Sequence, residues 1–164
     1  MTDTGEHLID FDAYVKDLAE DSDPTHEPDV LLLTCMDFRF FLEIAERMKG
    51  IKYDHVILAG AALGAVVKAK KKTWHPTFFD HLKLARKLHH IKSVLVMEHR
   101  ECGAYGPDPG FGLLDPKPDR EREREVHEEQ VAKLEALIPD DLGFCALLLE
   151  VPPHINALTF DKLK

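Results

Sequence analysis

The sequence predicts an α/β fold, with a mostly parallel sheet of four to five strands flanked by helices. Short apolar runs of strand length alternate along the chain with segments whose apolar residues recur at helical spacing. The runs are almost continuously apolar, as in parallel strands that are buried on both faces. At 164 residues the chain is long enough to bury one substantial core. We therefore expect a single domain over residues 1–164, comprising an N-terminal helical arm (1–28), a core (29–151) and a C-terminal tail (152–164).

The first helix is predicted over residues 8–20, where Asp10 is a plausible N-cap. Its apolar residues recur at the spacing of one helix face, Phe11, Tyr14, Val15 and Leu18. A charged segment with two prolines, residues 21–29, then leads into the first buried strand, Val30 to Leu33.

A second helix is predicted from Phe40 to Lys49, ended by Gly50. Its expected core face comprises Phe40, Phe41, Ile44 and Met48. The second strand is expected from His55 to Ala59 and runs into Gly60–Gly64, which lacks the Lys-Ser/Thr of a phosphate-binding loop. The lysine-rich run Lys68–Lys72 is typical of a solvated surface.

The C-terminal half is predicted to contain two helices and two strands. A helix with Pro76 in its first turn runs to His90, and the third strand follows from Ile91 to Met97. The stripe expected to face the core comprises Phe78, Phe79, Leu82, Ala85 and Leu88. A loop rich in glycine and proline, Gly103–Pro118, separates this strand from a charged helix that Asp119 caps.

We expect the Arg/Glu alternation of this last helix to be a solvated surface with pairs four residues apart. Its expected apolar residues are Val126, Val131, Leu134, Leu137 and Ile138. A fourth strand follows, Phe144–Val151, which Pro152 and Pro153 end.

Composition limits the function. The net charge of −9 does not favour a nucleic-acid or anionic-membrane partner. The sequence contains no apolar stretch of membrane-spanning length and no signal-peptide pattern at Met1, so we expect a cytoplasmic protein. Three separated cysteines do not suggest a disulfide framework. Cys145, inside an apolar strand, is predicted to be an ordinary buried residue.

Reactive side chains gather where two predicted strands end. Cys35, Asp37 and Arg39 follow the first strand, and Glu98–Cys102 follows the third. Because chemistry in parallel sheets gathers beyond the carboxyl ends of the strands, we expect Cys35, His99 and Cys102 to come together. Two thiolates and one imidazole would form a three-ligand metal site with an open position.

These residues resemble the β-class carbonic anhydrases. Cys35-Met-Asp-Phe-Arg39 matches the C-x-D-x-R motif of that family, and His99-Arg-Glu-Cys102 matches its H-x-x-C motif, in the same order and each after a predicted strand. The resemblance covers residues 29–151. It implies a β-carbonic-anhydrase-like α/β fold and a zinc ion, Zn2+, held by Cys35, His99 and Cys102.

The resemblance also implies an activity, the reversible hydration of carbon dioxide to bicarbonate by a zinc-bound hydroxide. In it Asp37 accepts a hydrogen bond from the hydroxide and Arg39 holds Asp37 in place. Alternatively, Asp37 is the fourth ligand, which closes the site. The resemblance further implies that the small-molecule substrate lies beside Ala59, Gly60 and Gly103. It also implies a homodimer or a higher homo-oligomer, in which the helix over residues 8–20 extends as an arm across the partner subunit.

Several positions depart from the usual family pattern. Ile57 and Leu58 stand where Arg-Asn is common, Glu98 stands where Gly precedes the zinc histidine, and Ala104 replaces the second Gly after the last cysteine. The changes remove polar groups from the expected pocket and place a carboxylate beside it. Two alternatives therefore stand beside carbon dioxide hydration: hydrolysis of a sulfur analogue, carbonyl sulfide or carbon disulfide, and a non-catalytic zinc-containing assembly or binding module.

Overall fold

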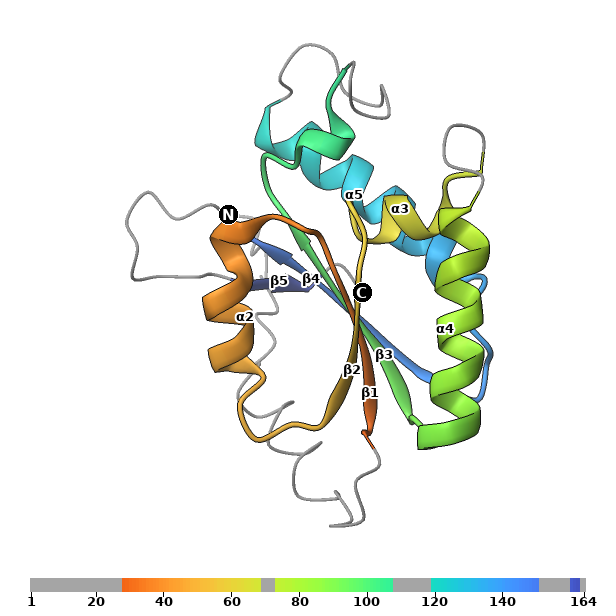
Figure 1. Cartoon of the computed structure of the whole chain (residues 1–164). Helices are drawn as coiled ribbons and strands as arrows, with labels where there is room; N and C mark the ends of the chain where they lie inside the picture. The colour runs from red at the N-terminus through yellow and green to blue at the C-terminus, as the bar shows by residue number, and fades with distance from the viewer. Residues whose placement is uncertain (1–27, 69–72, 108–118, 151–159, 163–164) are drawn as a thin grey trace, which may run out of the picture.

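The computed structural model describes residues 28–68, 73–107, 119–150 and 160–162, and these contain one five-stranded sheet of order β2-β1-β3-β4-β5. The first four strands in that order are parallel, and β5 pairs antiparallel with β4. The bounds are β1 Val30–Thr34, β2 Tyr53–Ile57, β3 Ser93–His99, β4 Gly143–Leu149 and β5 Phe160–Lys162. The predicted α/β class and mostly parallel sheet are confirmed (Figure 1).

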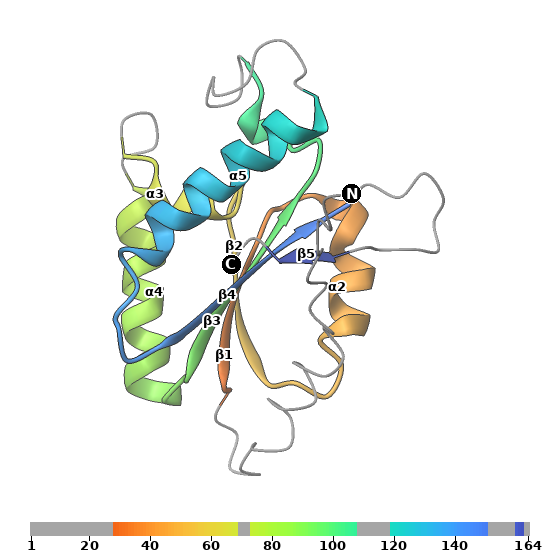
Figure 2. The ribbon, with the colours of Figure 1, turned by 180° about the vertical axis from the view of Figure 1, so that it is seen from behind.

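Helices cover both faces of the sheet, with α2 on one face and α3, α4 and α5 on the other (Figures 1 and 2). Their bounds are η1 Phe38–Phe40, α2 Phe41–Arg47, α3 Ala62–Val66, α4 Trp74–His89, η2 Gly103–Tyr105 and α5 Arg120–Glu135. Alternate residues of β1 supply the two cores, because successive side chains of a strand point to opposite faces. Leu31 and Leu33 pack in the core beneath α4 and α5, whereas Val30 and Leu32 pack in the core beneath α2.

The predicted elements are confirmed with shifted ends. The second strand starts and ends two residues earlier than expected, and the third extends to His99, so a metal-site residue belongs to the strand itself. In α2, Phe41 is 38% exposed and lies off the predicted core face, because Phe38–Phe40 forms a separate 3₁₀ turn. In α4, Leu88 is 57% exposed, which also differs from prediction. The predicted helix over residues 8–20 lies outside the described residues.

The most informative difference concerns α5. Asp119 caps it as predicted, with its carboxylate accepting the backbone N–H of Arg122 at 2.8 Å. Leu137, expected in the core, is 45% exposed. Conversely, three polar residues spaced along one helix face are buried among the residues that face the sheet: Glu123, His127 and Gln130. The prediction that the Arg/Glu alternation is a solvated surface is therefore wrong at Glu123, although Arg124 and Glu128 form a pair four residues apart as predicted.

The chain order reverses between β1 and β3. From β1 the chain passes through α2 to β2 at one edge, whereas from β3 it passes through α5 to β4 on the other side. Such a reversal opens a crevice at the carboxyl ends of the two central strands, where α/β proteins bind ligands. The residues that follow β1 and those that end β3 are therefore candidates for a functional site.

The helices α4 and α5 each have 16 residues. Neither these nor the shorter helices of the described part combine the length and apolar character needed to span a bilayer.

Candidate metal centre

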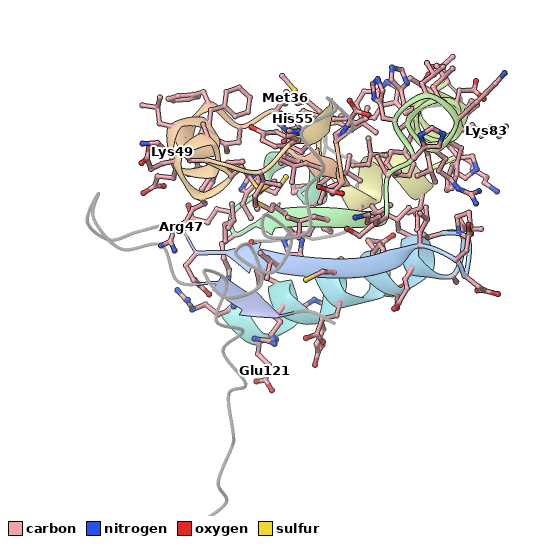
Figure 3. All side chains as sticks on the ribbon, turned by 90° about the horizontal axis from the view of Figure 1, so that it is seen from below. Met36, Arg47, Lys49, His55, Lys83 and Glu121 are labelled. Atoms are coloured by element: carbon pink, nitrogen blue, oxygen red, sulfur yellow. The ribbon has the colours of Figure 1, made fainter. Side chains whose placement is uncertain are left out.

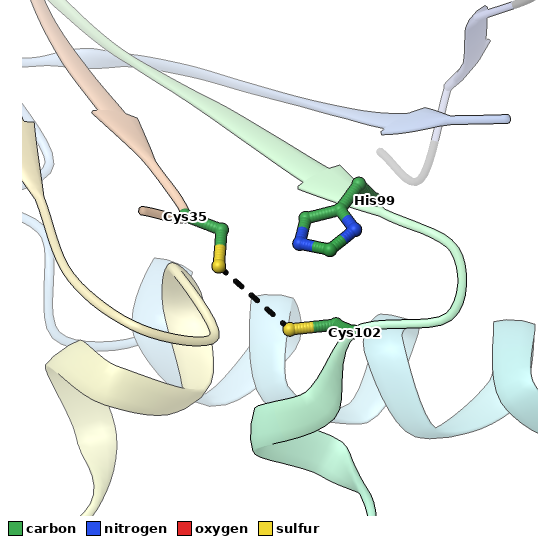
Figure 4. A group of neighbouring side chains, drawn as sticks. All are labelled: Cys35, His99 and Cys102. Atoms are coloured by element: carbon green, nitrogen blue, oxygen red, sulfur yellow. Dashed lines mark hydrogen bonds between the residues drawn. The ribbon is translucent and has the colours of Figure 1, made fainter. Parts of the chain in front are cut away.

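Cys35, His99 and Cys102 meet at this crevice. Cys35 directly follows β1, His99 is the last residue of β3, and Cys102 precedes the short helix η2. One ligand atom from each residue lies within 4.8 Å of the other two, and the two Sγ atoms are 3.8 Å apart (Figure 4). All three side chains are buried, so they form a compact donor set shielded from solvent.

The orientation of His99 fits a metal ligand. Its Nδ1 donates a hydrogen bond to the carbonyl oxygen of Arg100 at 2.8 Å. The lone pair of Nε2 is then available to bind a metal ion. Nε2 is buried and has no hydrogen-bond partner among the described residues. A buried nitrogen without a partner costs free energy that a bound cation would offset. Zinc commonly takes two thiolates and one imidazole in catalytic sites, so the three residues present fit zinc.

The two thiols share a proton. A hydrogen bond from Cys102 lowers the pKa of Cys35, and His99 and the Gly60 N–H, 3.4 Å from Sγ, add to this against the opposing effect of burial. The same hydrogen bond and burial raise the pKa of Cys102, which keeps the proton. Burial by itself lowers the pKa of His99, but the Cys35 thiolate, the hydrogen bond to the Arg100 backbone and the charge of Asp37 together outweigh it and raise the pKa. The group therefore holds one thiolate before any metal binds.

Asp37 and Arg39 form the pair that the C-x-D-x-R motif predicts. The guanidinium donates from Nε to Oδ1 at 3.0 Å and from Nη2 to Oδ2 at 2.7 Å, and the Arg39 backbone N–H donates to Oδ1 at 3.0 Å. These hydrogen bonds lower the pKa of Asp37 and keep it ionised. Its Oδ2 lies 3.8 Å from His99 Nε2. Asp37 is thus beside the donor set, but its oxygens are occupied by Arg39.

The turn after β2 lies against the same site. Gly60 has a φ of 75°, in the left-handed region, and a methyl group at this position would lie 3.0 Å from Cβ of Ala104. The Ala104 methyl group therefore sits where Gly60 leaves room for it. Ala59 is half-buried and Gly103 is exposed. The role of Ala59, Gly60 and Gly103 in a substrate pocket stays a prediction.

Glu98 does not project into a pocket, contrary to the expectation that it adds a carboxylate there. The side chain is 1% exposed and its oxygens are hydrogen-bonded inside the protein. Oε1 accepts the backbone N–H of Ala62 at 2.7 Å, while Oε2 accepts the Tyr105 hydroxyl at 3.1 Å and lies 3.0 Å from Nδ1 of His127. The departure from the family pattern is therefore compensated by donors from three other segments.

Sequence reasoning singled out neither Tyr105 nor Glu123, and it had no reason to select His127. The signal that could have found two of them is the spacing of Glu123, His127 and Gln130, which places three polar residues on one helix face. Without knowing which face meets the sheet, that spacing cannot be told from a solvated stripe.

The prediction that Cys145 is an ordinary buried residue agrees with the structure. Cys145 is buried within β4. His89 lies at the end of α4 with Nδ1 2.7 Å from Asp54, and His75 Nδ1 lies 2.8 Å from the Ala65 carbonyl oxygen. Among the described residues, neither histidine belongs to the group that could hold a metal ion.

Comparison with known proteins finds relatives by sequence and by structure, although no protein-family profile matches the chain. An uncharacterized protein of Rickettsia bellii is 35% identical over 119 residues, which cover 70% of each chain. A second uncharacterized protein, from Rickettsia conorii, is 34% identical over 119 residues, covering 70% of this chain and 62% of that protein.

Solved structures of β-class and other carbonic anhydrases resemble the whole chain. The carbonic anhydrase of Streptococcus mutans has a TM-score of 0.55 at 20% identity over 93% of this chain and 92% of its own. The enzyme of Glaciozyma antarctica gives 0.55 at 18% identity over 100% of both chains. A tetrameric β-carbonic anhydrase of Sordaria macrospora gives 0.55 at 15% identity, over 92% and 85%.

The chain therefore has the fold of the β-class carbonic anhydrases, which confirms the resemblance seen in the sequence at the level of fold. At identities of 15–20%, this similarity shows the fold alone. By sequence, the chain belongs to the same family as the uncharacterized protein of Rickettsia bellii.

Proposed function

We propose that this protein is a zinc-dependent lyase that catalyses the reversible hydration of carbon dioxide to bicarbonate. The observation that carries the proposal is the buried group of Cys35, His99 and Cys102, with an ionised Asp37 held by Arg39 beside it. The carbonic anhydrase fold supports the same conclusion.

Cys35, His99 and Cys102 would hold the zinc ion, which when bound would lower the pKa of a coordinated water from its bulk value to about 7. Asp37 is ionised and can only accept hydrogen bonds, so it would accept one from the attacking water and orient that oxygen toward the carbon of the substrate. Arg39 holds the Asp37 carboxylate through its bidentate contact, so that Asp37 would accept a hydrogen bond and not bind the metal itself. The Arg100 carbonyl fixes the tautomer of His99.

We also propose that the protein forms a homo-oligomer, as the tetrameric β-carbonic anhydrases of Sordaria macrospora do. Large apolar side chains lie exposed around η1, α2 and β2, an edge strand of the sheet; one of them, Met36, is labelled in Figure 3. The exposed set comprises Met36, Phe38, Phe41, Leu42 and Ile57. Phe41 and Ile57 line one hollow on this surface, and exposed apolar surface of this kind marks interaction sites. Sedimentation of Leu42→Glu should then give a lower mass than wild type; an unchanged mass would reject this surface.

The test of the activity is stopped-flow hydration of carbon dioxide by zinc-loaded protein at mildly alkaline pH. We expect turnover well above the buffer rate and its loss in Cys102→Ser, which replaces a thiolate ligand. A wild-type rate no better than buffer would reject carbon dioxide as the substrate. Carbonyl sulfide and carbon disulfide would then be assayed with the same pair of proteins, and absence of turnover with all three would leave the non-catalytic zinc module.

A further inference from the structure

The segment that carries two of the three metal-site residues, Glu98–Cys102, rests on one face of α5. Two buried side chains of that face contact it: Glu123, which is 8% exposed, and His127, which is fully buried. They lie one helical turn apart, so they point to the same side of α5. Neither residue is used in the proposed chemistry.

His127 holds the start of the segment through Glu98. An ionised carboxylate accepts hydrogen bonds, so Nδ1 of His127 donates to Oε2 across 3.0 Å. The other oxygen of Glu98 accepts the Ala62 N–H at 2.7 Å. Ala62 follows the turn in which the Gly60 N–H donates to Cys35 Sγ at 3.4 Å. Glu98 therefore links α5 to both ligand-bearing parts of the chain.

Glu123 holds the other part of the segment. Its carboxylate accepts the backbone N–H of Glu101 and lies 3.6 Å from the buried guanidinium of Arg100. Glu101 has a φ of 55°, a left-handed conformation that is strained for a residue with a side chain. Such a conformation persists only where the surroundings fix it. A second carboxylate also holds the Arg100 side chain, because Nε of Arg100 donates a hydrogen bond to Glu150 at 3.0 Å.

We propose that Glu123 and His127 are positioning residues of the metal centre, through which α5 fixes the segment Glu98–Cys102 before a metal binds. His127 acts through Glu98, and Glu123 acts through Arg100 and the Glu101 amide. The proposal rests on the proposed metal site, but it does not depend on which reaction occurs there. Because residues that orient metal ligands typically contribute 10–100-fold in affinity, we expect losses of about that size when either contact is removed.

The test compares two pairs of variants. Glu123→Ala and His127→Leu remove the contacts, whereas Glu123→Gln keeps an acceptor for the Glu101 amide and His127→Asn keeps an N–H donor near the position of Nδ1. Glu121→Ala is the matched control, since Glu121 also lies in the first turn of α5 but points away from the rest of the molecule (Figure 3). It removes the same favourable interaction of an acidic side chain with the helix dipole.

Three quantities are measured on folded protein: zinc affinity by chelator competition, the visible spectrum of the Co2+-substituted protein, and the alkylation rate of Cys102 in the metal-free protein. We expect zinc binding about 10–100-fold weaker in Glu123→Ala and His127→Leu, a changed Co2+ spectrum and faster alkylation, with most of the loss recovered in the Gln and Asn variants. The control should match wild type.

Unchanged affinity, spectrum and alkylation in Glu123→Ala and His127→Leu would overturn the proposal, as would an equal loss in Glu121→Ala. If an Ala or Leu variant fails to fold, its Gln or Asn partner decides: a small residual loss of zinc affinity relative to Glu121→Ala supports the proposal, and an affinity equal to that of Glu121→Ala overturns it. These outcomes are separate from those of the activity assay. If the wild-type protein binds zinc but hydrates no carbon dioxide, the proposed function is rejected. The positioning role of Glu123 and His127 is then still decided by the zinc affinities of the variants relative to wild type.

Discussion

Arg39→Ala tests whether the guanidinium keeps Asp37 in its working position. In the structure Asp37 receives hydrogen bonds from Nε and Nη2 of Arg39, at 3.0 and 2.7 Å, and one from the Arg39 backbone N–H at 3.0 Å. The substitution removes the side-chain contacts and leaves the backbone one. Asp37 could then turn toward the metal position, since its Oδ2 is already 3.8 Å from His99 Nε2.

The size of the effect follows from the contacts that are lost. A hydrogen bond to a charged group contributes about 1.5–3 kcal/mol. The Arg39 side chain is 36% exposed, and solvent screening reduces the contribution of the whole pair to roughly 1–2 kcal/mol. Since about 1.4 kcal/mol corresponds to a tenfold change in rate, we expect kcat/KM to fall roughly 5–30-fold.

The assay is stopped-flow carbon dioxide hydration, with zinc content measured on the same samples. Lys49→Ala serves as the control, because Lys49 is an exposed cation whose partner, Glu46, is on the surface. We expect Arg39→Ala to keep its zinc and lose rate, and the control to keep both. Full kcat/KM in Arg39→Ala would refute the role assigned to the Asp37–Arg39 pair, and loss of zinc would assign Arg39 to metal retention instead.

Three further predictions follow from the same geometry. Gly64→Ala should lower the free energy of unfolding by about 1–3 kcal/mol in denaturant titrations, because a Cβ there would lie 2.6 Å from the Ala59 carbonyl oxygen; unchanged stability would contradict this packing. Cys102→Ser should weaken zinc binding in chelator competition while the fold is kept, and retained affinity would remove Cys102 from the ligand set. Because the pKa values of Cys102 and His99 are raised in the metal-free protein, zinc should displace about one to two protons and bind more tightly as pH rises. Calorimetry in two buffers of different ionisation enthalpy measures the proton count, and zero release would contradict the shared proton.

The positions of the metal-site residues could be predicted because they follow from strand order alone. Cys35 comes directly after one buried strand and His99 ends another, and neighbouring parallel strands bring their carboxyl ends to one edge of the sheet. The pairing of Asp37 with Arg39 is equally local, since the two residues are two positions apart in the chain. Short sequence motifs were therefore sufficient to predict most residues of the site.

The surroundings of the site could not be predicted, because they depend on contacts between distant segments. Glu98 stands in the sequence as a lone carboxylate, and its three donors come from Ala62, Tyr105 and His127 in separate elements. The charged face of α5 looks solvated until the packing of the helix buries Glu123. A polar group can be buried only where the fold places hydrogen-bond partners beside it. The periodicity of the sequence does not show which distant residues supply those partners.

The central claim is that Cys35, His99 and Cys102 hold a zinc ion with an open fourth position. X-ray absorption at the zinc edge of the purified protein tests it most directly, because sulfur and nitrogen ligands lie at different distances, near 2.3 and 2.0–2.1 Å respectively. The account predicts about one zinc per chain with two sulfur ligands, one histidine nitrogen and one further light atom, and one fewer sulfur in Cys102→Ser. A protein without stoichiometric zinc, or a spectrum without two sulfur ligands, would contradict it.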